Sequence, residues 1–175
     1  MSGAEGSTAN PWTFSVRAIE GQIPRASLRT TLTYRIHPNL SGGIEYNPRV
    51  NKASPLANWL AVKETTHGPA LIVGTSSDRI GTPSGQSFYA TASKNLKRET
   101  RLPIAPYFGA AYGTFEDKLR PIGGMNIGFT EQLTGLIIFD GVHVHEMFSY
   151  SYQRHVLSLV LVRGKHPGVS YSVGF

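Results

Sequence analysis

The sequence has no cysteine, little charge and no long apolar run, and each shortage excludes a class of protein. Without cysteine, the chain can form no disulfide framework, thiolate metal site or cysteine nucleophile. Charged residues make up 16% of the chain, well below the roughly 25% of ordinary soluble domains. No segment approaches the roughly 18 consecutive apolar residues that a membrane-spanning helix needs. Disulfide-stapled mini-domains, zinc fingers and helical membrane proteins are therefore excluded.

What the chain does have, from Pro11 onward, is alternation of apolar and polar residues. In segment 28–36 the even positions are mainly apolar and the odd positions are Arg or Thr, and segment 40–51 repeats the pattern. A period of two is typical of half-exposed β-strands. The pattern predicts an all-β domain without a convincing helix.

The alternation and the intervening turn residues divide the chain into strands. The predicted strands are 12–20, 27–36, 40–51, 55–64, 70–78, 86–94, 102–114, 119–130, 134–141, 146–153, 156–163 and 168–175. The alternation slips at 55–64 and 134–153, where we expect β-bulges. We predict a flexible tail over residues 1–11, which are small and polar, and one antiparallel domain of twelve strands over residues 12–175, with ten strands as the alternative.

Short turns such as 37–39 and 130–132 follow even-numbered strands, whereas longer or Gly/Pro-rich connections such as 20–26 and 77–85 follow odd-numbered ones. Segment 94–101 is an exception. In an up-and-down arrangement the two classes lie at opposite ends, as in outer-membrane barrels with short periplasmic turns.

Aromatic residues are expected in two bands, one near each end of the strands, as membrane interfaces require. Tyr46, Phe88, Tyr112, Phe115, Phe139 and Phe148 map to the end with the longer connections. The band at the short-turn end contains Trp12, Phe14, Tyr34, Phe129, Tyr150, Tyr152 and Phe175.

The last eight residues, from Gly168 to Phe175, alternate Val, Tyr, Val and Phe with Ser and Gly. This segment resembles the closing strand of bacterial outer-membrane β-barrels, whose terminal Phe is read by the barrel-assembly machinery. The resemblance implies a transmembrane up-and-down β-barrel in the outer membrane of a Gram-negative cell, in contact with lipid and lipopolysaccharide. The first residues contain no signal peptide. We expect one to have been removed.

A weaker resemblance covers residues 69–130. The segments Pro69–Thr75 and Gly81–Lys94 are similar to a strand–loop–strand unit of large outer-membrane proteins linked to exopolysaccharide secretion. The loop 74–85 is expected to be extracellular. It lacks the Gly-Lys-Ser/Thr ending of a phosphate-binding loop.

The polar faces of the strongly alternating strands supply the candidate pore-lining residues. These are Arg17, Arg29, Arg35, Glu45 and Arg49. Two interpretations stay open: an anion-biased pore whose field comes from these arginines, or an interior filled by Arg–carboxylate pairs.

Other sites are weaker candidates. His143 and His145 form a His-x-His pair beside Asp140 and Glu146 that could bind a metal, but an Asp-Gly turn in an exposed loop explains it more simply. Ser149 or Ser151 with either histidine lacks a nucleophile motif and an orienting group. We therefore expect no enzyme, metal or cofactor. The basic run 94–101 could contact headgroups or a partner, and a solvated turn is the simpler interpretation.

The formal net charge of +6 does not itself choose a partner. Nucleic acid is disfavoured because no basic stripe is interleaved with stacking aromatics. The sequence predicts a small barrel acting as a narrow passive channel, a porin in the broad sense. The alternative is a non-conducting barrel that serves an envelope assembly or polysaccharide export, with residues 1–11 or 94–101 contacting a partner. A soluble lipocalin-like barrel is a third possibility, which the two aromatic bands disfavour.

Overall fold

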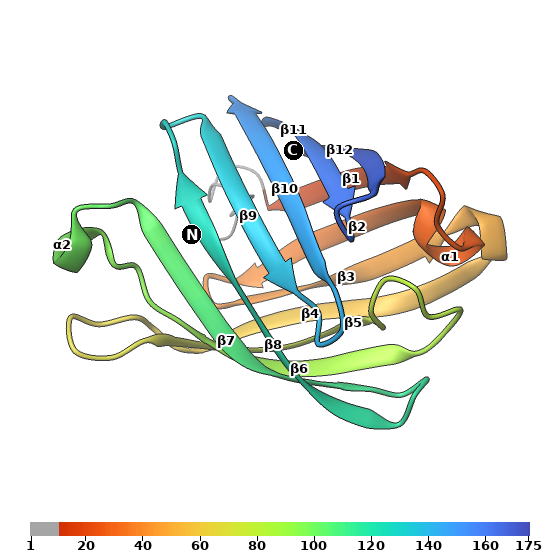
Figure 1. Cartoon of the computed structure of the whole chain (residues 1–175), viewed down its shortest axis with the longest axis horizontal. Helices are drawn as coiled ribbons and strands as arrows, with labels where there is room; N and C mark the ends of the chain where they lie inside the picture. The colour runs from red at the N-terminus through yellow and green to blue at the C-terminus, as the bar shows by residue number, and fades with distance from the viewer. Residues whose placement is uncertain (1–10) are drawn as a thin grey trace.

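The computed structural model describes residues 11–175 as a closed antiparallel β-barrel of twelve strands, each paired with its neighbours in sequence (Figure 1). The predicted twelve-strand up-and-down barrel is confirmed. Apart from Pro11, the predicted tail lies outside the described residues. The strands are β1 (Trp12–Ile19), β2 (Leu28–His37), β3 (Leu40–Asn47), β4 (Lys52–Val62), β5 (Ala70–Ser77), β6 (Gln86–Ser93), β7 (Ile104–Gly113), β8 (Lys118–Gly128), β9 (Leu133–Phe139), β10 (Val144–Tyr152), β11 (His155–Val162) and β12 (His166–Gly174).

The barrel closes where β1 pairs with β12. Seven residue pairs run from Thr13 opposite Gly174 to Ile19 opposite Gly168. Beyond them, Trp12 donates a backbone hydrogen bond to Phe175 at 3.1 Å and accepts one from it at 3.0 Å. A closed sheet has no unpaired edge, which is the condition for a sheet to span a bilayer.

Three short helical turns lie in the connections between strands. Helix α1 (Pro24–Ser27) lies between β1 and β2, the 3-10 turn η1 (Pro48–Val50) between β3 and β4, and α2 (Lys97–Thr100) between β6 and β7. Helices α1 and α2 lie at opposite ends of the barrel (Figure 1). We call the end that holds Trp12, Phe175 and α2 the terminal end, and the end that holds α1 the plug end.

The expected difference in connection length between the two ends is wrong. The terminal end has short turns at 38–39 and 153–154, but also the longer connections 63–69 and 94–103. The plug end has the longer connections 20–27 and 78–85 beside short turns such as 163–165. Turn residues alone do not report how far a loop extends, because strand ends fray into the connections.

Bulges lie at two positions in the sheet. One lies between Leu60 and Val62, within the segment where the alternation slips, and the other lies between Arg35 and His37. The bulge expected in 134–153 is wrong, because β9 and β10 pair without a register shift around the turn 140–143.

The two faces of the sheet differ in chemistry. Residues directly opposite in register share a face, and the buried residues Ile19, Glu45 and Val160 mark the face that lines the lumen. The outward face carries large exposed apolar side chains, including Phe108 and Leu159. Within the strands from Trp12 to Gly174, Glu146 is the one Asp, Glu, Lys or Arg on that outward face.

Candidate functional site: the lumen and its plug

An arginine cluster lines the lumen near the plug end. Arg17 on β1 and Arg29 on β2 lie directly opposite each other in register, and both side chains are on the lumen face. Like charges in this position repel. An Arg29 Nη2 atom lies 2.5 Å from Glu45 Oε2, and Glu45 is fully buried. Arg29 therefore has a carboxylate partner.

Glu45 is held in place from its own strand. Asn47 Nδ2 donates a hydrogen bond of 2.9 Å to Glu45 Oε1, and Asn47 is almost fully buried. A buried carboxylate needs both a cation and hydrogen-bond donors to stay ionised. Arg29 and Asn47 together meet that need.

The connection 78–85, which we call the plug loop, crosses the mouth of the barrel. Ile80 packs against a buried apolar cluster of Ile19, Val160 and Val162, with Met147 beside it. These four residues belong to β1, β10 and β11, on the far side of the closed sheet from β5 and β6, which carry the loop. The plug loop therefore reaches across the opening rather than away from it.

Arg25 of α1 fixes the plug loop from the adjacent wall. Its Nε donates to the Thr82 carbonyl at 2.6 Å, and an Nη2 atom donates to the Asp78 carbonyl at 3.0 Å and to the Arg79 carbonyl at 2.7 Å. Arg25 and Thr82 are both buried. A buried guanidinium is stable only when its donors are satisfied, and here the carbonyls of the plug loop satisfy them.

The middle of the loop favours a glycine at position 81. Gly81 has φ +105°, a backbone conformation that side chains other than glycine rarely adopt. A Cβ at this position would meet the guanidinium of Arg163 in the β11–β12 turn. The plug loop thus touches the wall opposite its own strands.

An ion-pair bridge secures the third side of the loop. Arg79 Nη2 lies 2.6 Å from Glu116 Oε1, and Arg120 Nη2 lies 3.0 Å from Glu116 Oε2. Hydrogen bonds and charge from Arg79, with a further contribution from Arg120, lower the pKa of Glu116 to about 2. Glu116 in the β7–β8 turn is therefore ionised at any physiological pH.

Asp78 ties the start of the loop to the same turn. Its Oδ1 accepts from the Arg79 backbone N–H at 2.7 Å, and its Oδ2 accepts from the Phe115 backbone N–H at 3.2 Å. These two bonds orient the buried Asp78 carboxylate.

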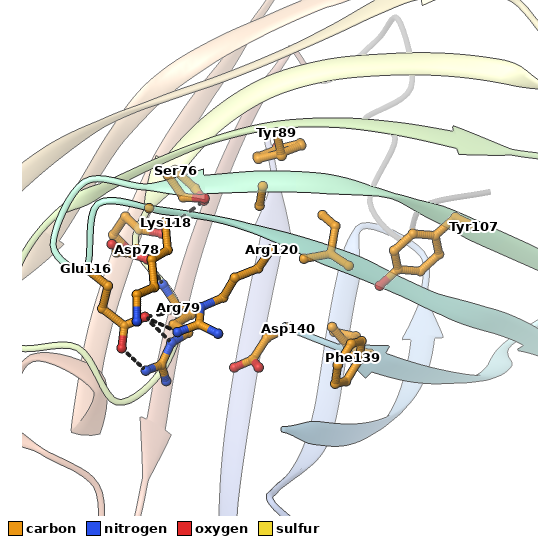
Figure 2. Close-up of a pocket in the computed structure, with 16 residues that line it drawn as sticks. Ser76, Asp78, Arg79, Tyr89, Tyr107, Glu116, Lys118, Arg120, Phe139 and Asp140 are labelled. Atoms are coloured by element: carbon orange, nitrogen blue, oxygen red, sulfur yellow. Dashed lines mark hydrogen bonds and ion pairs between the residues drawn. The ribbon is translucent and has the colours of Figure 1, made fainter. Parts of the chain in front are cut away.

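A cavity of about 180 Å³ remains between the plug loop and strands β5 to β9 (Figure 2). Charged side chains gather on one side of it, and Tyr89 and Tyr107 lie farther along the wall. The charged lining residues are Asp78, Arg79, Glu116, Lys118, Arg120 and Asp140. The plug thus narrows the lumen and leaves a polar space beside the loop.

The structure places four of the five candidate pore-lining residues on the lumen face: Arg17, Arg29, Arg35 and Glu45. Arg49 lies elsewhere, exposed in η1 after β3 has ended at Asn47. The predicted strand 40–51 is too long, because the alternation of residues continues beyond the end of β3. Pro48 has no backbone N–H to donate to the neighbouring strand.

The seven aromatics predicted for the short-turn end are all exposed and lie at or near the terminal end. Trp12 and Tyr34 are on neighbouring strands, with ring centroids 4.7 Å apart. Phe148, expected at the opposite end, instead stacks on Phe129 with centroids 6.3 Å apart. The reason is that β10 begins at Val144 rather than 146, which carries Phe148 deeper along the strand.

The histidine segment forms a pair rather than a cluster. His145 Nε2 lies 2.9 Å from Asp140 Oδ2, and the Arg163 backbone N–H approaches His145 Nδ1 at 3.3 Å. Burial opposes ionisation of Asp140, but hydrogen bonds from His145 and from the backbone of His143 and Val142 outweigh it and hold the Asp140 pKa below its usual range.

The serines proposed beside this segment lie apart from it. Ser149 is hydrogen-bonded at 2.8 Å to Ser158 on β11, rather than to a histidine. Among residues 11–175, no group of three or more His, Cys, Asp or Glu side chains is placed to hold a metal ion.

The residues that sequence reasoning missed are those of the plug, above all Arg25 and Ile80. Both lie in irregular connections, where a period-two pattern carries no information. An isolated Ile between charged and glycine residues in a polar loop was the available signal. The expectation that 74–85 is simply an extracellular loop missed its return across the mouth.

No protein-family model matches the chain, and neither does any curated protein sequence. In the part of the chain that the structure describes, none of the helices has the length and apolar character needed to cross a membrane. The function is therefore argued from the barrel and its lumen.

Proposed function

We propose that the protein is an outer-membrane β-barrel that forms a narrow passive channel with a preference for anions. The observation that carries the proposal is the polarity of the sheet: apolar side chains face outward, and serine, threonine and arginine side chains face the lumen. A soluble barrel has the opposite arrangement, because its outer face meets water. Lipid and lipopolysaccharide are the surroundings that such an exterior suits.

Anion preference follows from the charges along the lumen. Arg17, Arg29 and Arg35 line one wall, and Glu45 is the one carboxylate on the described strands that shares the lumen face with them. Rings and rows of arginine favour anions in narrow passages, where the field is poorly screened. The plug loop restricts the passage, so the expected conductance is small. No step requires a catalytic residue, metal or cofactor.

Assembly and partners belong to the same proposal. Phe175 directly follows β12 and is exposed, which suits recognition by the barrel-assembly machinery. At the terminal end, connection 63–69 is joined to 94–103 by Lys94 Nζ donating to the Thr66 carbonyl and by the Asn95 backbone N–H donating to Glu64, each at 3.1 Å. The connections 63–69 and 94–103, the second of which contains α2, together form a basic surface. That surface is suited to binding anionic headgroups or an envelope partner.

Recording from single channels in a planar lipid bilayer under a KCl gradient tests the proposal. We expect small discrete steps and a reversal potential that favours chloride, with the preference reduced in Arg29→Gln. Arg154→Gln, in the β10–β11 turn and away from the plug end, serves as the control and should leave the preference unchanged. Folded, inserted protein that never conducts would contradict the channel.

A non-conducting barrel with a structural or partner-binding role is the second candidate. It is favoured by one observation, the plug loop fastened on three sides of the mouth by Arg25, Ile80 and Arg79. Co-purification of an envelope protein that is lost on neutralising Lys97 and Arg98 of α2 would support this candidate. Conducting protein that purifies alone would exclude it.

A further inference from the structure

The arginine cluster below the plug contains one guanidinium more than its carboxylate can satisfy. Glu45 pairs with Arg29 at 2.5 Å and accepts from Asn47 at 2.9 Å. Arg17, opposite Arg29 in register, makes no hydrogen bond or ion pair with residues 11–175, and its Nε is buried without a partner. The Nε of Arg29 is likewise buried and unpartnered.

Neighbouring residues do not supply the missing acceptor. On β12 the residue opposite Arg17 is Ser170, and Ser172 lies opposite Ser15, two positions along the same face. The charges near Arg17 are those of Arg29, Glu45 and Arg25. Arg25 donates its hydrogen bonds to plug-loop carbonyls. It therefore adds positive charge to the cluster without adding an acceptor. Among residues 11–175, the cluster is therefore short of one anion.

Residues around the two arginines are shielded from water. Ile19, two positions beyond Arg17 on the same face, is buried, as are Glu45 and Asn47. Helix α1 and the plug loop lie at this end. Charge-assisted hydrogen bonds to an anion are strong in such a site. Two arginines on adjacent strands present the forked donors that tetrahedral oxyanions favour.

We propose that Arg17 and Arg29 form a binding site for one phosphate-type oxyanion on the lumen wall near the plug end, with Ser170 on the adjacent strand. The bound anion supplies the acceptors that Arg17 lacks. Glu45 competes with the anion for Arg29, so it sets an upper limit on the affinity and allows release. This inference builds on the proposed anion preference of the lumen and names the place and the ligand chemistry.

Isothermal titration of inorganic phosphate into the full, detergent-folded chain tests the site. We expect one phosphate per barrel. Arg17→Gln should weaken binding by about tenfold or more, and Glu45→Gln should strengthen it severalfold, because Arg29 is then free for the anion. Arg154→Gln, exposed in the β10–β11 turn at the terminal end, is the control and should bind as the wild type does.

Folding is checked for each variant by the difference in gel migration between unboiled and boiled protein. If Arg17→Gln fails to fold, Arg17→Lys keeps the charge, loses the fork and should still weaken phosphate binding. Absence of phosphate binding in the wild type, or binding unchanged in both Arg17 variants, would overturn the site. Sulfate present during the phosphate titration should weaken the apparent binding of phosphate, whereas chloride at the same ionic strength should not.

Channel recording separates failure of this inference from failure of the proposed function. Chloride conduction without phosphate binding would contradict the phosphate site and support the channel. Phosphate binding at Arg17 without conduction would support the phosphate site and contradict the channel.

Discussion

Arg25 and Thr82 lie in different loops, 57 positions apart in sequence, and two hydrogen bonds join them. Arg25 Nε donates to the Thr82 carbonyl at 2.6 Å, and an Nη2 atom donates to the Thr82 hydroxyl at 3.0 Å. The hydroxyl in turn donates to the Arg79 carbonyl at 2.9 Å. Arg25, in the connection between β1 and β2, therefore holds the plug loop in a defined position. Single substitutions can change that position.

Arg25→Ala should release the plug loop. The substitution leaves the buried carbonyls of Asp78 and Thr82 without their donors, which costs about 1–3 kcal/mol. We expect lower thermal stability and severalfold larger single-channel steps, because the loop no longer spans the mouth. Arg49→Ala, exposed in η1 at the same end, is the control. Steps of wild-type size from a folded Arg25→Ala barrel would show that the plug does not limit conduction.

Acid should loosen the plug through Glu116. Its pKa in the folded barrel, about 2, is below the ordinary value of 4.5, so the stabilisation is complete above pH 4.5 and is lost as the pH falls toward 2. Between those limits the steps should grow with acidity. Glu116→Gln should show enlarged steps already at neutral pH and a smaller response to acid.

The control for this prediction is Glu99→Gln at the terminal end, where Glu99 pairs with Lys94 at 3.3 Å. It removes one carboxylate without touching the plug and should titrate as the wild type does. Equal acid responses in Glu116→Gln and the wild type would remove Glu116 from the anchor.

The outward face should reject charge according to depth. Leu159 lies mid-strand on β11 and is 63% exposed, whereas Leu119 lies next to the start of β8 and is 70% exposed. Leu159→Arg should destabilise the barrel in lipid vesicles by about 2–4 kcal/mol, and Leu119→Arg by about 0–1 kcal/mol. Denaturant titration of folded barrels in vesicles measures both. Equal, small costs would indicate an outer face in water.

The terminal aromatic should matter for assembly more than for folding. Phe175 is exposed, and its backbone exchanges two hydrogen bonds with Trp12, which Phe175→Ala retains. We expect much less inserted protein in cells and an unchanged yield on refolding into detergent in vitro. A matched Phe129→Ala variant, also exposed at the terminal end, should insert normally. Equal insertion of the two variants would argue against a role in recognition.

The strands were predictable from the sequence because the outward and lumen faces of the barrel impose opposite chemistry on alternate residues. Segment 28–36 is the clearest example: Arg29 and Arg35 face the lumen while Leu32 and Tyr34 face outward. The same reasoning places Arg17 and Glu45 on the lumen face, where the structure has them. It failed at Arg49, where the alternation outlasts the strand.

The plug could not be predicted in this way. Its anchors join residues far apart in sequence, such as Arg79 and Glu116, and no local pattern specifies which loop turns inward. The sequence could predict that a lumen arginine pairs with Glu45, as Arg29 does, because an arginine-rich wall needs a carboxylate.

The most direct test of the account is a single-cysteine scan along β2, which a chain without cysteine allows on an otherwise unreactive background. Cysteines introduced at residues 30 to 35, one at a time, are probed in lipid vesicles with a water-soluble maleimide and, after labelling with a fluorophore, with nitroxide-labelled lipid. The account predicts a period of two, with the maleimide reacting at 31, 33 and 35 and lipid quenching at 30, 32 and 34. Maleimide reaction at 30, 32 and 34 without lipid quenching would contradict a membrane-spanning barrel.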